Sequence, residues 1–203
     1  TGGAGRIGSL FSEILLKQGY KVYILSSNSS NFAKKYSKKN KKISWINFDL
    51  RNPKVEEIKF LFKGICIDCL INCAAYSERG ENISYDNDNF YDEIKGIFGS
   101  SILLTESLLP NLRKKGGIII NVGSIWGLVS PDFRTYLNLN NAPSAVVSIG
   151  KAGLMQYTKF LASREAKHKI RVNNLVPGFF PRPGKIVRND YIEEIKKRTM
   201  LNK

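Results

Sequence analysis

The feature that most constrains the fold of this chain is the alternation of short apolar runs with longer amphipathic stretches. Apolar residues recur at helical spacing in the first stretch, at Ile7, Leu10, Phe11, Ile14 and Leu15, and Gly19 is well placed to end that helix. Further helices are expected over residues 55–62, about 90–112 and about 144–167, and strands over residues 22–25, 43–48, 67–72, 118–122 and 170–176. Strands separated by helices require crossover connections. The sequence therefore predicts a doubly wound α/β domain with a mostly parallel sheet.

The size and composition of the chain fit one domain. Its 203 residues, 42% of them hydrophobic, suffice for one core. No apolar run reaches the roughly 18 residues that a membrane-spanning helix needs, and no secretory leader is visible. We therefore expect a cytoplasmic protein with no membrane partner.

Two compositional features suggest other functions. Cys66, Cys69 and Cys73 could be redox or metal ligands, but their stretch is apolar throughout, like a buried strand in which cysteine serves as a small hydrophobic residue. We therefore expect no metal site. The formal net charge of +15 would suit a nucleic-acid binder if the positive residues gathered on one surface. The densest run, 34–42, could as well be solvated, so we expect anionic, phosphorylated ligands and no specific nucleic-acid partner.

The chain opens with glycines three residues apart, Gly2, Gly5 and Gly8, immediately before the first helix. Such glycines permit a tight turn and let the backbone approach a pyrophosphate, to which the helix N-terminus offers N–H donors and positive potential. The pattern predicts a dinucleotide site, with a plain glycine turn as the alternative.

The end of the strand predicted at 22–25 bears on the choice of cofactor. An acidic residue there would bind the adenosine ribose hydroxyls, but the strand runs into Ser26-Ser27-Asn28, and Lys34 and Lys35 follow. This favours NADP somewhat over NAD.

Four segments occur in order along the chain. They are Thr1 to Gly8, Asn72-Cys73-Ala74-Ala75, Asn121-Val122-Gly123-Ser124, and Lys151-Ala152-Gly153 with Arg171-Val172-Asn173 and Pro177-Gly178 downstream. Together they resemble the short-chain dehydrogenase/reductase family over nearly the whole chain. The resemblance implies a single Rossmann-like dinucleotide-binding domain over residues 1–203, truncated at both ends, without its first strand and its last helix and strand. Residues 130–133 and the insert to Pro143 are similar to reductases of bacterial surface-sugar pathways, which implies a small-molecule, sugar-linked substrate.

The resemblance also implies a role for individual residues. Gly2, Gly5, Ile7 and Gly8 would hold the pyrophosphate, Asp49 would lie near the adenine, Asn72 and Ala74 would flank the cofactor, and Pro177 and Gly178 would sit at the nicotinamide. Two structural alternatives stay open. Asn72 could only stabilise neighbouring strands, and Pro177-Gly178 could only end one.

In this family a tyrosine transfers a proton to or from the substrate oxygen while hydride moves between the nicotinamide and the adjacent carbon. A free phenol titrates near about pH 10, so a lysine four residues later on the same helix face must lower its pKa. That lysine also binds the nicotinamide ribose, and a serine binds the reacting oxygen. Ser124 and Lys151 match these catalytic roles, but Val147 stands at the tyrosine position and Ile97 about where a helix asparagine is expected. Tyr136 could swing into the site, although an ordinary loop position is favoured.

These patterns predict an NAD(P)-dependent oxidoreductase that acts on a hydroxyl or carbonyl group, with an unconventional proton donor. General acid–base catalysis contributes about 10²–10⁴-fold to the rate, and without the tyrosine this contribution would be lost. The alternative is therefore a catalytically impaired cofactor binder that acts as a partner subunit or regulator. The resemblance further implies a homo-oligomer built through the helices that contain Phe98 and Leu154. Their apolar faces could equally be intrachain core.

Overall fold

The computed structural model describes residues 1–27, 36, 41–77, 87–136, 142–180 and 189–199. Its strands pair in parallel, as crossover connections require. β1 (Val22–Ser26) pairs with β2 (Ile43–Asn47), and β4 (Gly117–Val122) lies between β3 (Cys69–Asn72) and β5 (Ile170–Leu175).

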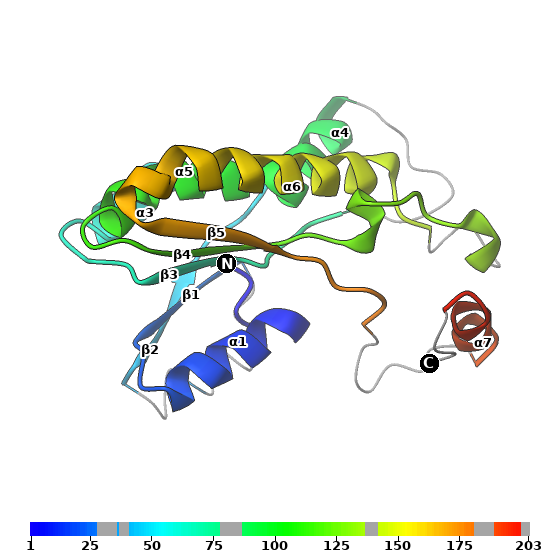
Figure 1. Ribbon diagram of the computed structural model, residues 1–203, viewed down its shortest axis with the longest axis horizontal. Coiled ribbons are helices and arrows are strands. Elements are labelled where there is room, and N and C mark those ends of the chain that lie inside the picture. Colours follow the sequence, from blue (N-terminus) through cyan, green and yellow to red (C-terminus); the bar gives the residue numbers. More distant parts are fainter. Residues whose placement is uncertain (28–35, 37–40, 78–86, 137–141, 181–188, 200–203) are drawn as a thin grey trace.

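Helices cover both faces of these strands. α1 (Arg6–Lys17) lies on one side, while α5 (Ser100–Leu112) and α6 (Ala145–Glu165) lie on the other (Figure 1). The other α-helices of the described residues are α3 (Val55–Leu61), α4 (Asn87–Ile94) and α7 (Asn189–Lys197), and the short 3₁₀-helices are η2 (Ile125–Gly127), η3 (Phe133–Thr135) and η5 (Ala166–His168). The predicted doubly wound α/β class is confirmed.

The single helix expected over about 90–112 is interrupted. α4 passes into a π-helical segment, Lys95–Gly99, before α5 begins. The backbone N–H of Tyr76 donates to the carbonyl of Gly96 at 3.1 Å, and a chain that inserts into the hydrogen-bond ladder of a helix distorts it. A Cβ at position 96 would lie 2.6 Å from the Cβ of Tyr76, so only glycine permits this approach.

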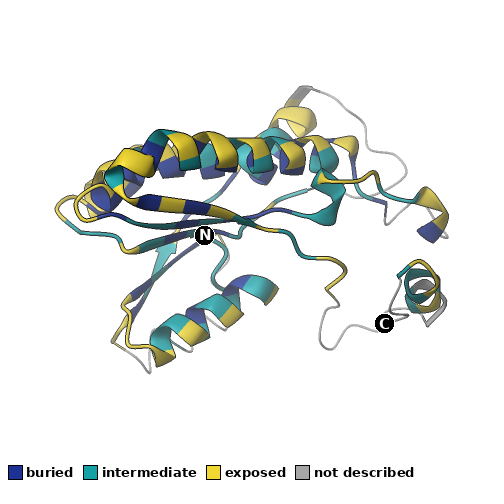
Figure 2. Cartoon of the chain, viewed as in Figure 1, coloured by how far each residue is buried: buried dark blue, intermediate teal, exposed yellow. Residues whose placement is uncertain are grey.

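The main core lies between the three-stranded sheet and the inward faces of α5 and α6, which are buried along their length (Figure 2). Its most enclosed side chains are at most 2% exposed: Leu104, Leu108, Leu112, Ile119 and Leu161. A smaller cluster of Val22, Ile24 and Ile43 packs against α1. The molecule thus has one large apolar centre and a second, thinner one under α1.

A buried polar chain crosses the main core. The amide of Asn72 donates to Thr105 Oγ1 at 2.9 Å and to Asn121 Oδ1 at 2.8 Å, and the amide of Asn121 donates to Thr158 Oγ1 at 2.9 Å. Asn72 and Asn121 are at most 1% exposed. Buried amides are costly unless paired, so these bonds fix β3 and β4 against α5 and α6 in one register.

Within the described residues the strands form two sheets, β1–β2 and β3–β4–β5. The start of the chain joins the two sheets. The Thr1 amine donates to the carbonyl of Ile71 in β3 at 2.6 Å, and the N–H of Gly2 donates to the carbonyl of Leu25 in β1 at 2.8 Å. A cavity of about 150 Å³, lined by residues of β1 and β3, lies beside this bridge. The glycine-rich loop is therefore held by both sheets at once.

Candidate cofactor and catalytic site

The glycine-rich loop is folded so tightly that side chains are excluded from it. Gly2 has a φ of +67°, and a Cβ there would lie 2.8 Å from the backbone of Ala74. A Cβ at Gly8 would lie 2.1 Å from the carbonyl oxygen of Gly2. The N–H of Gly5 closes the turn on that carbonyl at 2.8 Å. At Gly2 and Gly8 the loop therefore has room for backbone alone, and close approach to a diphosphate requires glycines at such positions.

The loop leads directly into the N-terminus of α1. Gly5 is the N-cap residue and provides no side-chain hydrogen bond, and the first turn carries no acidic residue. Ile7 is half-buried in that turn. No carboxylate of the first turn therefore neutralises the partial positive charge of this helix end. Free N–H groups and this charge favour a bound anion.

Two of the predicted flanking residues follow β3, but their environments differ. The N–H of Ala74 donates to Thr1 Oγ1 at 3.1 Å, which places Ala74 against the glycine-rich loop. Asn72 is committed to the buried polar chain described above. Asn72 thus lies in the core with its amide nitrogen hydrogen-bonded, and Ala74 lies at the loop.

Asp49 lies after β2 and is half-buried. Its carboxylate accepts hydrogen bonds from Arg51, from Nε at 3.3 Å, Nη2 at 3.1 Å and the backbone N–H at 2.9 Å. The side-chain and backbone bonds from Arg51 lower the pKa of Asp49, so the carboxylate is charged at neutral pH. The Arg51 guanidinium in turn lies 5.1 Å from the ring centroid of Tyr76, which links the end of β2 to the segment after β3.

Pro177 and Gly178 follow β5 on the same edge of the sheet. The carbonyl of Pro177 accepts from the N–H of Ile125 at 3.3 Å, and the carbonyl of Leu175 accepts from Gly123 at 2.8 Å. These bonds join the segment after β5 to the segment that carries Ser124. Gly178 is exposed, and a Cβ there would meet no atom within 4 Å.

Ser124 and Lys151 belong to adjoining segments. Ser124 caps η2, and its Oγ accepts from the N–H of Trp126 at 3.2 Å, which leaves the hydroxyl hydrogen to be donated. Lys151 Nζ donates to the carbonyl of Val122 at 2.8 Å. A Cβ at Gly127 would lie 2.8 Å from the carbonyl carbon of Lys151, so η2 packs directly on α6. The structure therefore brings the two predicted catalytic residues to one region at the end of β4.

Lys151 is only 7% exposed. Burial lowers the pKa of Lys151 to about 8, and the charge of Cys73 opposes this shift. A lysine with this pKa loses its charge near pH 8, whereas an exposed lysine stays charged up to about pH 10.4.

The residues at the expected tyrosine and asparagine positions are packed as apolar groups. Val147 lies one turn before Lys151 on α6 and is half-buried. Ile97 is 2% exposed, and a Cβ at Gly150 would lie 2.5 Å from its Cγ2. Tyr136 ends η3 and packs its ring against Phe133 at 6.2 Å between centroids.

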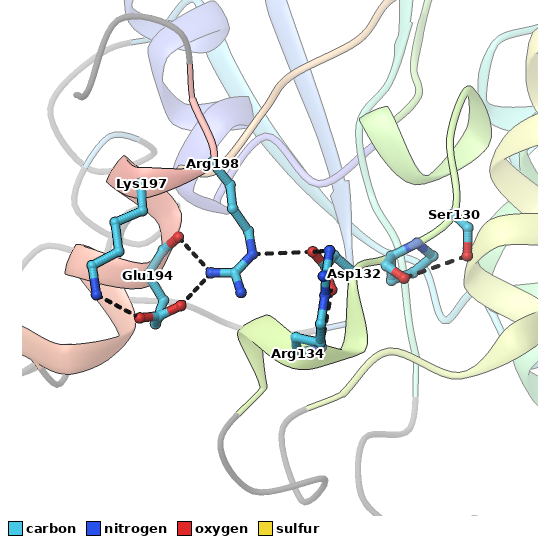
Figure 3. A network of polar contacts seen from close by, with 7 residues as sticks. Ser130, Asp132, Arg134, Glu194, Lys197 and Arg198 are labelled. Atoms are coloured by element: carbon cyan, nitrogen blue, oxygen red, sulfur yellow. Dashed lines mark hydrogen bonds and ion pairs between the residues drawn. The ribbon is translucent and has the colours of Figure 1, made fainter.

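A chain of ion pairs joins η3 to α7 (Figure 3). Asp132 accepts from Arg134 Nη2 at 2.9 Å and from Arg198 Nε at 3.0 Å, and Arg198 also pairs with Glu194. The bonds from Arg134, then those from Arg198, lower the pKa of Asp132. Sequence reasoning singled out residues 130–133 but not Arg198, because a pair separated by 66 residues leaves no local signal.

Other predictions concern metals, membranes and cofactor choice. Cys66, Cys69 and Cys73 are free thiols, and no cluster of His, Cys, Asp or Glu suited to a metal ion occurs in the described ranges. No helix among the described residues is long and apolar enough to cross a membrane. Lys34 and Lys35, which entered the prediction of NADP, lie outside the described residues.

Comparison with known proteins agrees with this geometry. The family model of the short chain dehydrogenases matches residues 1–186. Carbonyl reductase family member 4 of Danio rerio is 26% identical over 87% of this chain and 72% of its own length. The 3-oxoacyl-[acyl-carrier-protein] reductase of Homo sapiens is 24% identical over 97% of this chain and 77% of its own.

A solved structure agrees as well. The crystal structure of a short chain dehydrogenase from Leptospira borgpetersenii with bound NAD⁺ superimposes with a TM-score of 0.82, at 30% identity, over 99% of this chain and 76% of that one. The match of fold extends over the glycine-rich loop, the segments after the strands and α6. This chain belongs to the short-chain dehydrogenase family.

Proposed function

We propose that the protein binds NAD(H) or NADP(H) along the carboxyl ends of its strands and catalyses hydride transfer to or from a carbonyl or hydroxyl carbon. The proposal rests on the tightly folded glycine-rich loop and on Ser124 and the buried Lys151, whose segments adjoin at the end of β4. The carbonyl and oxoacyl reductases among its relatives support a carbonyl substrate class.

The residues fit a dinucleotide. A Cβ at Gly2 or Gly8 would overlap backbone atoms, and α1 begins at Arg6 between these two glycines with its free backbone N–H groups. Gly2, Gly5, Ile7 and Gly8 would hold the diphosphate through backbone groups, with Ala74 and Pro177 on either side. When bound, the nicotinamide ring supplies or accepts the hydride.

The protein's own residues must bind the substrate oxygen and move a proton. The Ser124 hydroxyl, whose oxygen already accepts from Trp126, can donate its hydrogen to that oxygen. Val147 has no ionisable group, so it cannot take part. Lys151 is buried beside this segment with its pKa lowered to about 8 by desolvation, and we assign the proton transfer to it.

A second function has its own support. Val147 and the buried Ile97 are apolar, so the protein could bind the cofactor and act as a partner subunit or regulator with little turnover. The two functions share the proposed cofactor site and differ in turnover alone. Substituting one side chain separates them.

The test uses calorimetry for NADH and NADPH binding and the absorbance at 340 nm for turnover of carbonyl substrates, including keto-sugar nucleotides. The oxidoreductase proposal predicts turnover that Lys151→Met abolishes and Lys159→Met, an exposed change on the same helix, leaves intact. Val147→Tyr should raise turnover by about 10²–10⁴-fold. Binding without turnover in the wild type, together with rescue by Val147→Tyr, would establish the regulatory alternative. Absence of binding to either cofactor would refute both.

The finer predictions remain proposals. β1 ends at Ser26, and the exposed Ser27 follows it. We propose a preference for NADP because neither serine repels a 2′-phosphate. The similar dehydrogenase from Leptospira borgpetersenii, by contrast, holds NAD⁺. Ser27→Asp should lower the affinity for NADPH relative to NADH. A sugar-linked substrate, a homo-oligomer, a cytoplasmic location and a single domain over residues 1–203 likewise stay predictions.

A further inference from the structure

The turns that precede the strands lie at one edge of the molecule. The strands within each sheet are parallel. The two sheets also run the same way, because the first two residues of the chain bond to the ends of β3 and β1. The turns before all five strands therefore lie at a common edge, opposite the edge of the candidate site (Figure 1).

The five residues before each strand are rich in lysine. Those that the structure describes are 17–21, 41–42, 64–68, 112–116 and 165–169. Their nine cations, named the basic edge below, are all exposed: Lys17, Lys21, Lys41, Lys42, Arg113, Lys114, Lys115, Lys167 and Lys169. Their two acidic residues are Asp68, which pairs with Lys115 at 2.8 Å, and the buried Glu165. The basic edge therefore has a large excess of positive charge.

Contacts between the turns join these cations into a row. The carbonyl of Lys42, before β2, accepts from the first N–H of β1 at 2.7 Å, and the carbonyl of Lys169, before β5, accepts from the first N–H of β4 at 3.3 Å. Lys114 Nζ donates to the carbonyl of Gly64, before β3, at 2.7 Å. Lys21 lines the same cavity as the turn before β3. Paired strands lie about 4.8 Å apart, so the cations follow one another closely across the strand ends.

The opposite edge carries no such excess. The described residues among the five that follow each strand are 27, 48–52, 73–77, 123–127 and 176–180. The charged residues of these segments are Asp49 and Arg51, which pair with each other at 3.1 Å. The charge is thus segregated to the edge away from the candidate site, where it attracts anions.

The side chains of the basic edge suit the phosphates of a nucleic acid better than a membrane. Lysines are point charges that attract phosphates without reading bases. Binding to a lipid surface grows with the apolar area that enters it, and Tyr20, 44% exposed, is the one large exposed apolar side chain in the described residues of these turns. An aromatic ring beside a row of cations offers a base a stacking surface.

We propose that the basic edge, with Tyr20, binds single-stranded nucleic acid through its phosphates and independently of sequence. This interaction is separate from the cofactor site and does not rest on the proposed function. No local run of sequence predicts the surface, because its cations come from five turns spread over residues 17–169.

The test follows the fluorescence anisotropy of two unrelated labelled RNAs of about 20 nucleotides, longer than one site of about 4–16. Both should bind with a Kd of about 10⁻⁴–10⁻⁶ M at physiological salt, and log K should fall with log salt by about 0.7 per phosphate contact. The edge variant combines Lys114→Gln, Lys115→Gln, Lys167→Gln and Lys169→Gln. The control variant removes equal charge from other exposed positions by Lys54→Gln, Lys95→Gln, Lys159→Gln and Lys197→Gln.

The edge variant should weaken RNA binding by about 10-fold or more and flatten the salt slope by up to about 3, whereas the control should stay within twofold of the wild type. Thermal melting shows that both variants are folded. Equal losses in the two variants would assign the binding to net charge alone and refute the proposal, as would the absence of RNA binding by the wild type.

Two competitors test the location and the partner. Saturating NADH should leave the RNA affinity within twofold, and displacement of RNA by NADH would place the RNA at the cofactor site and refute the proposal. Tighter binding to phosphatidylglycerol vesicles than to RNA, at equal phosphate concentration, would make the basic edge a membrane contact instead. RNA binding in a protein that binds neither NADH nor NADPH would refute the proposed function and leave this inference standing.

Discussion

Replacing Lys151 with methionine should stabilise the fold at neutral pH. The pKa of Lys151 is about 8 because of burial, against an ordinary value of 10.5, and each pKa unit is worth about 1.36 kcal/mol. Below about pH 8 the buried charge therefore lowers the free energy of unfolding by about 3 kcal/mol. Methionine removes that loss but also a hydrogen bond to the carbonyl of Val122, worth about 1 kcal/mol. The expected net gain in unfolding free energy is about 2 kcal/mol at pH 7.

The pH dependence of this gain is the sharper measurement. Below about pH 8 both folded and unfolded chains carry the proton, so the gain is constant. Between about pH 8 and 10.5 only the unfolded chain still holds it, so the wild type becomes more stable as pH rises and overtakes the variant. Urea unfolding from pH 6.5 to 10.5 measures both chains, with Lys159→Met as the exposed control on α6. A variant less stable at pH 7, by an amount that does not change with pH, would refute the reasoning.

Three further outcomes are expected from the packing. Gly8→Ala should abolish NADH binding in calorimetry, because the added Cβ would overlap the carbonyl oxygen of Gly2. Gly153→Ala should instead raise the unfolding free energy by about 0.5–1 kcal/mol, because its Cβ would meet nothing within 4 Å. Glu165→Gln should lower the unfolding free energy by about 1.5–3 kcal/mol in urea, because the buried Glu165 carboxylate accepts from Arg113 and Arg164, which lower its pKa to about 2; unchanged stability would contradict this. The wild type should lose this stabilisation as pH falls from about 4.5 to about 2. Asp132→Asn should speed amide exchange in α7, and about 1 M salt, which shortens the Debye length to about 3 Å, should remove the difference from the wild type.

The strands and helices could be predicted because their signals are local. The boundaries of α1, β1 and β4 lie within about two residues of those expected from apolar periodicity. The π-helical segment Lys95–Gly99 could not be predicted, because it arises where Tyr76 inserts its N–H into the helix ladder. That contact joins segments that are far apart in sequence and has no periodicity of its own.

The candidate site was predictable in the same uneven way. Ser124 and Lys151 were expected from the resemblance to the family, and the structure places their segments together. The contact of Arg6 with Phe180 was missed. Arg6 and Phe180 are 174 residues apart, so no local pattern pairs them. The contact could be found only from the three-dimensional path of the segment after β5.

The division of the strands into two sheets has a consequence for how the molecule opens. Val22, Ile24 and Ile43 form a small apolar cluster under α1, and Leu25 and Phe48 join this layer to the main core. Detaching the β1–β2 layer in a partial unfolding event must therefore break those contacts as well. A ligand that spans the glycine-rich loop would touch both layers and make that event costlier by RT ln(1 + [L]/Kd). Resistance to proteolysis in β1 and β2 would then report cofactor occupancy without any catalytic readout.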